Sequence, residues 1–231
     1  MKKRITALFL SFVILVFSFG AGALLLGYYT YRRAVGQMSL EQKVEIIKAS
    51  EYYVPLEQIP EMYKNAVIAT EDRRFYEHGA LDFRSLARSA VTDFKSFSLE
   101  QGGSTITQQL AKNFYFTGDK FFVRKIAEVF AAYAIERKYS KDEILTLYAN
   151  TIYFGKSSNG IGQAARNYYG RRPRELSDFM CVTLAGLPKA PSYYERNPDM
   201  LKIRQRQVIG DLMECGFITP SQAGSMLAQI G

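Results

Sequence analysis

The chain has 231 residues, of which 48% are hydrophobic and 23% charged, and its formal net charge is +8. Five of its 30 Lys and Arg residues flank a single apolar segment, which leaves 25 cations against 22 acids in residues 34–231. A nucleic-acid-binding protein would carry a larger excess of cations over its body, so nucleic acid is not expected as a partner. Cys181 and Cys215 lie in apolar surroundings, whether they pair is left open, and no CxxC spacing points to structural zinc.

Residues 5–29 contain no charged side chain and are mostly apolar. The stretch exceeds the roughly 20 residues that cross a bilayer and the roughly 7–15 apolar residues of a cleaved signal peptide. We therefore predict a membrane-spanning helix, with cleavage near Ala21-Gly22-Ala23 as the alternative. Basic residues at positions 2–4 favour a cytoplasmic N-terminus and an exported body.

The remaining sequence predicts one helical domain at 59–231, joined by a membrane-proximal connector at 34–58 to residues 1–33, the cytoplasmic end and the span. Apolar periodicity and cap residues indicate a helix leading into Glu71 and further helices at 82–95, 105–113, 121–139, 141–150, 161–169, 176–187, 199–214 and 220–229. No sustained alternation and no internal repeat occur, so the fold class is all-α, with short strands left open in residues 30–60.

The octet from Glu71 to His78 combines three carboxylates, two guanidiniums and the only histidine of the chain. It follows the apolar run 66–70, so Glu71 and Asp72 stand where a buried helix meets something polar. A carboxylate at such a boundary is suited to proton transfer. The alternative is a helix-end ion cluster in which Glu71, Arg74 and His78 pair at i, i+3 and i+4 spacing, and the octet alone favours that alternative.

Two glycines and a hydroxyl cap open the next helix, at Gly102-Gly103-Ser104-Thr105. Exposed backbone amides at a helix start can bind an anion such as phosphate, and the amides of Gln108 and Gln109 suit sugar hydroxyls. A plain capped helix would explain the hydroxyls, but it does not require the glycines before them or the glutamines after them.

Cations crowd the first turns of the helix at 121–139, where the helix dipole disfavours them. Lys120, Arg124 and Lys125 are these cations, and Glu128 stands one turn after Arg124. The pattern fits either an i, i+4 ion pair or a cationic patch that awaits an anion.

Five motifs, in this order, resemble those of the peptidoglycan glycosyltransferases, or transglycosylases, which form the N-terminal half of class A penicillin-binding proteins and also occur as monofunctional enzymes. The motifs are Glu71-Asp72-x-x-Phe75-x-x-His78, Gly103-x-Thr105-Ile106-Thr107-Gln108-Gln109, Arg124-Lys125-x-x-Glu128, Lys141-x-x-Ile144-Leu145-x-x-Tyr148-x-Asn150 and Leu184-Ala185-Gly186-Leu187-Pro188. The resemblance implies a lysozyme-like, two-lobed, all-α domain. Because no Ser-x-x-Lys or Lys-Thr-Gly transpeptidase motif occurs, the chain is similar to the monofunctional members.

The resemblance implies a polymerase that elongates glycan strands from lipid II, with inversion at the sugar carbon and release of undecaprenyl diphosphate. Glu71 would be the general base on the acceptor 4-hydroxyl, and Glu128 a second catalytic carboxylate. A diphosphate leaves without a proton, so one base and several cations suffice, whereas a glycoside hydrolase also needs a carboxylic acid. The substrate-binding residues would be Ser104, Thr105, Gln108, Gln109, Lys112, Lys120, Arg124 and Lys125, and the motifs would be organised by Asp72, Phe75, His78 and Asn150.

Cofactor and location follow from the same resemblance. No cofactor is implied with certainty, and a divalent cation, Mg²⁺ or Mn²⁺, aided by Glu128, is left open. The expected partners are lipid II, the growing lipid-linked glycan, the membrane and other wall-synthesis proteins. The protein is expected to cross the bacterial inner membrane once, with its domain in the periplasm. The rival functions are a lysozyme-like lytic enzyme and a non-catalytic membrane scaffold.

Two positions depart from the family pattern. His78-Gly79-Ala80 stands where the family has His-x-Gly, and Met180 stands where it has a glutamate. The first departure bears on the loop after the base, and the second on an ion pair in the last motif.

Overall fold

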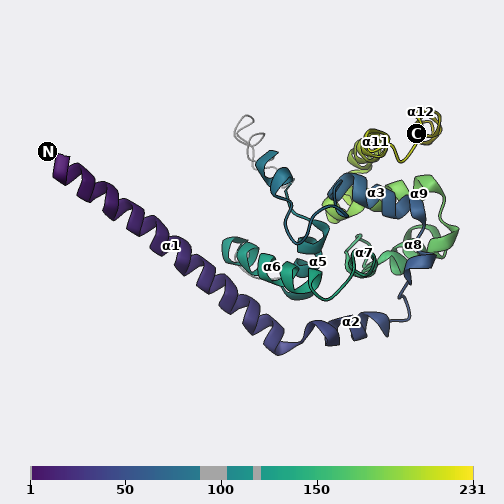
Figure 1. Cartoon of the computed structure of the whole chain (residues 1–231). Helices are drawn as coiled ribbons and strands as arrows, with labels where there is room; N and C mark the ends of the chain where they lie inside the picture. The colour runs from purple at the N-terminus through teal and green to yellow at the C-terminus, as the bar shows by residue number, and fades with distance from the viewer. Residues whose placement is uncertain (1, 89–102, 117–120, 231) are drawn as a thin grey trace.

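The computed structural model describes residues 2–88, 103–116 and 121–230, and these are built from helices (Figure 1). The α-helices are α1 (Lys2–Gln37), α2 (Leu40–Lys48), α3 (Glu61–Glu71), α5 (Ile106–Tyr115), α6 (Phe121–Glu136), α7 (Lys141–Thr151), α8 (Ile161–Tyr169), α9 (Asp178–Gly186), α10 (Pro191–Arg196), α11 (Pro198–Glu214) and α12 (Pro220–Leu227). Three short 3₁₀ helices are η1 (Leu56–Gln58), η2 (Pro173–Glu175) and η3 (Leu187–Lys189), and residues 83–88 are also helical. The described part contains no strand beyond one isolated bridge between Tyr153 and Asn159, so the all-α prediction is confirmed.

Side-chain caps fix where several helices begin. Ser39, Thr105, Ser140 and Thr219 each accept a hydrogen bond from the backbone amide three residues on, and a Gln or Glu at that position returns one to the cap's own amide. These reciprocal caps satisfy donors that would otherwise lack a partner at a helix start. The helix starts predicted at Thr105 and Ser140 are therefore confirmed.

Helix α1 is longer than the predicted span of residues 5–29 and ends at Gln37, just inside the connector predicted at 34–58. Its 34 residues from Arg4 to Gln37 are long and apolar enough to cross a membrane. The connector is also more regular than predicted, because the Ser39 cap starts α2 and this short helix buries Leu40 and Val44 against the body.

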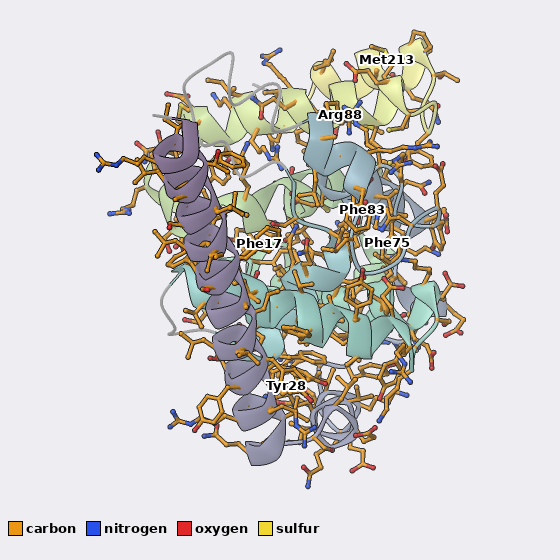
Figure 2. The ribbon with its side chains drawn as sticks, turned by 60° about the vertical axis from the view of Figure 1, so that its left-hand side comes forward. Phe17, Tyr28, Phe75, Phe83, Arg88 and Met213 are labelled. Atoms are coloured by element: carbon orange, nitrogen blue, oxygen red, sulfur yellow. The ribbon has the colours of Figure 1, made fainter. Side chains whose placement is uncertain are left out.

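The end of α1 packs against α6, at close range. A Cβ atom added to Gly27 would lie 2.3 Å from Cγ2 of Ile126, so only glycine fits at this crossing. One turn further on, the ring of Phe130 lies 5.3 Å from that of Tyr28 and 6.2 Å from that of Tyr31. Figure 2 shows Tyr28 near the end of α1 that meets the body, whereas Phe17 lies farther along the helix and is exposed.

The body consists of two groups of helices that correspond to the two predicted lobes. Helices α3, α9 and α11 pack on one another, and α5 packs on both α6 and α7. Tyr63 and Tyr148 are fully buried, one in each group. Glu71 is the last residue of α3, so its side chain emerges where the two groups meet.

The glycine at the α1–α6 crossing yields the first prediction. Gly27→Leu should push α1 away from α6, because overpacking a close contact costs on the order of 1–3 kcal/mol, and should lower the thermal unfolding midpoint in detergent. Gly22→Leu is the matched control, since nothing lies within 4 Å of a Cβ at Gly22. Equal midpoints for the two variants would show that the crossing does not stabilise the protein.

Candidate active site

The carboxylate of Glu71 is held on both oxygens by groups from two other helices. Oε2 accepts a hydrogen bond of 2.9 Å from Nε2 of Gln109 on α5, and Oε1 accepts one of 3.1 Å from Nη2 of Arg204 on α11. The hydroxyl of Tyr148 on α7 donates to Oε1 of Gln109 at 3.4 Å. Because its side chain is only 16% exposed, Glu71 has the fixed orientation that a general base needs.

Asp72, the residue after Glu71, connects the end of α3 to the start of α5. Its Oδ2 accepts a hydrogen bond of 3.1 Å from the amide of Ile106, and its Oδ1 lies 2.7 Å from Nε2 of His78. Burial raises the pKa of Asp72, and the bonds from His78 and the Ile106 amide oppose that rise. Asp72 and His78 thus hold α5, with Gln109, against the end of α3.

The proposed ion cluster of Glu71, Arg74 and His78 does not form. Helix α3 ends at Glu71, so the spacing that would align these side chains is lost. Arg74 instead pairs with Asp82, whose Oδ1 also accepts from the amide of Ser85 at 3.0 Å. Burial alone would raise the pKa of Asp82, but the bonds from Arg74 and Ser85 hold it well below its ordinary value.

The two glutamines at the start of α5, Gln108 and Gln109, have different hydrogen-bond partners. Thr105 is the N-cap, and Oε1 of Gln108 accepts from the Thr105 amide at 3.0 Å. Gln108 is buried in this cap, whereas Gln109 binds Glu71. The Thr105 hydroxyl donates to the carbonyl of Ala80 at 3.0 Å, so the loop after His78 is tied to α5 despite its shifted glycine. Gly102 lies outside the described residues.

The cations of α6 meet a buried acid and a hydroxyl. Glu128 is 2% exposed; its Oε1 lies 3.2 Å from Nε of Arg124 and its Oε2 3.0 Å from Nζ of Lys125. The same Nζ donates to Oγ of Ser104 at 2.7 Å. The i, i+4 ion pair therefore forms, and anion binding by these cations stays a prediction. Lys112 is exposed near the end of α5, and Lys120 lies outside the described residues.

A cavity of about 110 Å³ is lined both by Glu71 and by the residues at the start of α5. Its lining includes Glu71, Asp72, Ser104 and Thr105 from the predicted site, and it is completed by Thr70, Arg73, Asp82, Ser85, Arg88 and Gly103. Ser104 thus connects the cavity of Glu71 to Lys125.

Phe75 and Asn150 lie away from this cavity and serve packing. Phe75 is fully buried, with Nζ of Lys141 4.5 Å from its ring centre. Asn150 binds the connector through both backbone groups of Val54, each at 2.8 Å. It also lines a second, larger cavity of about 480 Å³ between α2, the connector and the ends of α5 and α7, which contains none of the predicted catalytic or substrate-binding residues.

The donor groups of the site suit a divalent cation poorly. Both oxygens of Glu128 already face cationic side chains. Asp72, His78 and Asp82 place ligand atoms within 4.8 Å of one another, but each of these side chains already has a protein hydrogen-bond partner. None of the reaction steps proposed for this chain uses a metal.

Arg204 is a site residue that lies outside all of the predicted motifs. It contacts Glu71 from a helix predicted correctly at 199–214, and it is 6% exposed. A signal was present, because Arg204 lies four residues before Val208 and so falls on the buried stripe of α11. A cation on an apolar stripe requires a buried partner. Its partner, however, lies 133 positions earlier in the chain.

Comparison with known proteins agrees with this geometry. A family model described as Transglycosylase matches residues 39–213. Penicillin-binding protein 1A of Neisseria gonorrhoeae is 44% identical over 189 residues, which are 81% of this chain and 23% of that protein; the protein of that name from Neisseria flavescens is 40% identical over 179 residues, 77% and 22% of the two chains. This chain therefore spans about a quarter of the length of those relatives.

A third relative matches over its whole length. A Cupriavidus necator protein whose name gives it as a candidate transglycosylase is 38% identical over 229 residues, which are 98% of this chain and 97% of that protein. The family match covers most of the body and all of the described site residues. This chain belongs to the transglycosylase family, and its predicted enzyme class is that of a peptidoglycan glycosyltransferase.

Proposed function

We propose that this chain polymerises peptidoglycan glycan strands from lipid II, by inverting transfer to the 4-hydroxyl of an acceptor sugar with release of undecaprenyl diphosphate. The observation that carries the proposal is one continuous arrangement. Glu71 and Ser104 line the same cavity, and the Ser104 hydroxyl is bound by Lys125, beside Arg124 and Glu128. A base thus stands at one end of the site and a cationic group at the other.

Glu71 would take the proton from the acceptor hydroxyl as the new glycosidic bond forms. Its carboxylate is held by Gln109 and Arg204, yet each carboxylate oxygen has more than one lone pair. The hydroxyl can therefore bind Oε2 while the existing contacts orient the group. Attack on the face opposite the leaving diphosphate, with no covalent glycosyl-enzyme, inverts the sugar carbon.

The cations would stabilise the diphosphate as negative charge develops on it. Arg124 and Lys125 sit on the first turns of α6, where they add positive charge to that of the helix start. Glu128 binds both cations and so fixes their positions. Preorganised charges of this kind act on the transition state without reorganising during the reaction.

Helix α1 would hold the site beside its lipid-linked substrate. Its apolar length suffices for one span, and its contact with α6 places the cationic helix next to the anchor. In this arrangement the N-terminus is cytoplasmic and the body lies in the periplasm at the bacterial inner membrane. Other wall-synthesis proteins are the expected partners there.

Incubating the purified full chain with lipid II separates this proposal from its rivals. Long glycan chains would support polymerisation. Soluble fragments released from finished peptidoglycan would instead indicate a lytic enzyme, and the absence of either product a scaffold.

Glu71→Gln tests the base. It keeps the size of the side chain but removes the proton acceptor, so turnover of lipid II should fall by roughly 10²–10⁴-fold while the unfolding midpoint stays close to that of the wild type. Glu214→Gln is the control, because Glu214 is exposed and its ion pair in the described part of the chain is with Arg73, not with Glu71. Unchanged turnover in Glu71→Gln would exclude Glu71 as the base.

Glu128→Gln tests the placement of the cations. With one buried carboxylate fewer, Arg124 and Lys125 repel each other and lose their shared partner, so kcat should fall by about 10²-fold or more. Glu128→Asp keeps the charge and should recover part of the loss. If Glu128→Gln retains full kcat, the cations do not depend on Glu128 for their position.

A further inference from the structure

Arg204 reaches Glu71 from α11, which belongs to the same group of helices as α3, and its guanidinium is held at two points. Its Nη2 lies 3.1 Å from Oε1 of Glu71, and its Nε donates to the carbonyl of Gly186 at 3.3 Å. Gly186 ends α9, and a Cβ atom there would lie 3.1 Å from Cγ of Arg204. The glycine therefore leaves room for the arginine stem, and the guanidinium is anchored away from the base as well as on it.

The two oxygens of Glu71 receive different kinds of partner. Oε1 faces the charged guanidinium of Arg204, whereas Oε2 faces the neutral amide of Gln109. A charge-assisted hydrogen bond is roughly twice as strong as a neutral one, so the contact at Oε1 is the harder one to exchange. The oxygen left to a substrate hydroxyl is then Oε2.

We propose that Arg204 is the positioning residue for this base: it pairs with the Glu71 carboxylate at Oε1 and so turns Oε2 toward the acceptor hydroxyl. The inference rests on the proposed role of Glu71 and deepens it. Arg204 acts through Glu71 and takes no proton itself, because a guanidinium stays protonated in proteins.

Arg204 is the cation that hydrogen-bonds Glu71 among the described residues, and Arg73 and Arg88 line the same cavity as Glu71 without a described bond to it. Gln109 from α5 also faces Glu71, as do three tyrosines, Tyr63 from α3, Tyr148 from α7 and Tyr194 from α10. Burial raises the pKa of each of these tyrosines, so their hydroxyls stay neutral in the working range. Without Arg204, the hydrogen bond that the structure describes on Glu71 would come from the neutral amide of Gln109.

A purely structural role for Arg204 makes a different prediction. If Arg204 served only to join α11 to α9 and α3, its loss would lower stability and activity together at every pH. A positioning role also moves the acid side of the pH–activity profile. Removing a nearby opposite charge favours the neutral carboxyl, so the fall in activity on acidification should begin at a higher pH.

The experiment compares Arg204→Met and Arg204→Lys with a neighbour on the same helix. Gln205→Leu is the matched control, since Gln205 is buried and its Nε2 binds Oγ1 of Thr183 on α9 at 2.8 Å without contacting Glu71. Lipid II turnover is measured across pH for the full chain in detergent, with the unfolding midpoint of each variant. We expect Arg204→Met to lose at least tenfold in kcat with KM little changed, and the acid limb of its pH–activity profile to move to higher pH. Arg204→Lys should lie between Arg204→Met and the wild type. Gln205→Leu should keep the acid limb of the wild type.

A second measurement does not depend on turnover. The infrared difference between wild type and Glu71→Gln isolates the carboxylate band of Glu71, and its titration can be followed with and without Arg204. A band that titrates at the same pH in wild type, Arg204→Met and Arg204→Lys overturns the inference, as does an acid limb that stays in place. Should Arg204→Met not fold, Arg204→Lys decides by the same two criteria. One further outcome separates the two proposals. If the wild type forms no glycan, while the carboxylate band titrates at a higher pH in Arg204→Met than in the wild type, the proposed function is contradicted and the pairing is left intact.

Discussion

The rest of the site depends on how one partly buried carboxylate is held. A charged group removed from water is tolerated when it is paired and hydrogen-bonded, and Glu71 meets that condition through Arg204 and Gln109. These contacts come from α11 and α5, which belong to different lobes. Holding Glu71 in this orientation therefore requires both lobes to be in place, so the site forms only in the folded protein.

The cationic half of the site depends on a different contact, between α6 and the long helix α1. Arg124, Lys125 and Glu128 lie on α6 close to Ile126, the residue that packs on Gly27. Positions 124, 125 and 128 each lie within two residues of position 126 on the same helix, which is little more than half a turn. A shift of α1 at this crossing would thus reach the cations directly. The apolar helix, long enough to span a membrane, also serves as a support for the part of the site that would bind the diphosphate.

Local patterns in the sequence predicted the helices and most of the site, because caps and apolar stripes act over a few residues. Ser140 and Thr105 begin helices for reasons visible within four positions. The predicted ion cluster of Glu71, Arg74 and His78 was wrong because it assumed that α3 continued past Glu71. The chain instead leaves the helix at Asp72, whose carboxylate accepts a hydrogen bond from the amide of Ile106, the first residue of α5. The contact of Glu71 with Arg204 joins positions 133 residues apart, and no local pattern specifies such a pairing.

The two carboxylates of the site differ in what surrounds them, and that difference separates their tasks. Glu71 has one cation and one neutral amide as hydrogen-bond partners, so its pair with Arg204 carries no net charge and Oε2 lies beside the neutral amide. Glu128 has a cation at each oxygen. The group of three keeps a net charge of +1, and this surplus positive charge suits a diphosphate. The same residue type would thus serve as a base on α3 and as a support for cations on α6, according to the number of cations that each carboxylate binds.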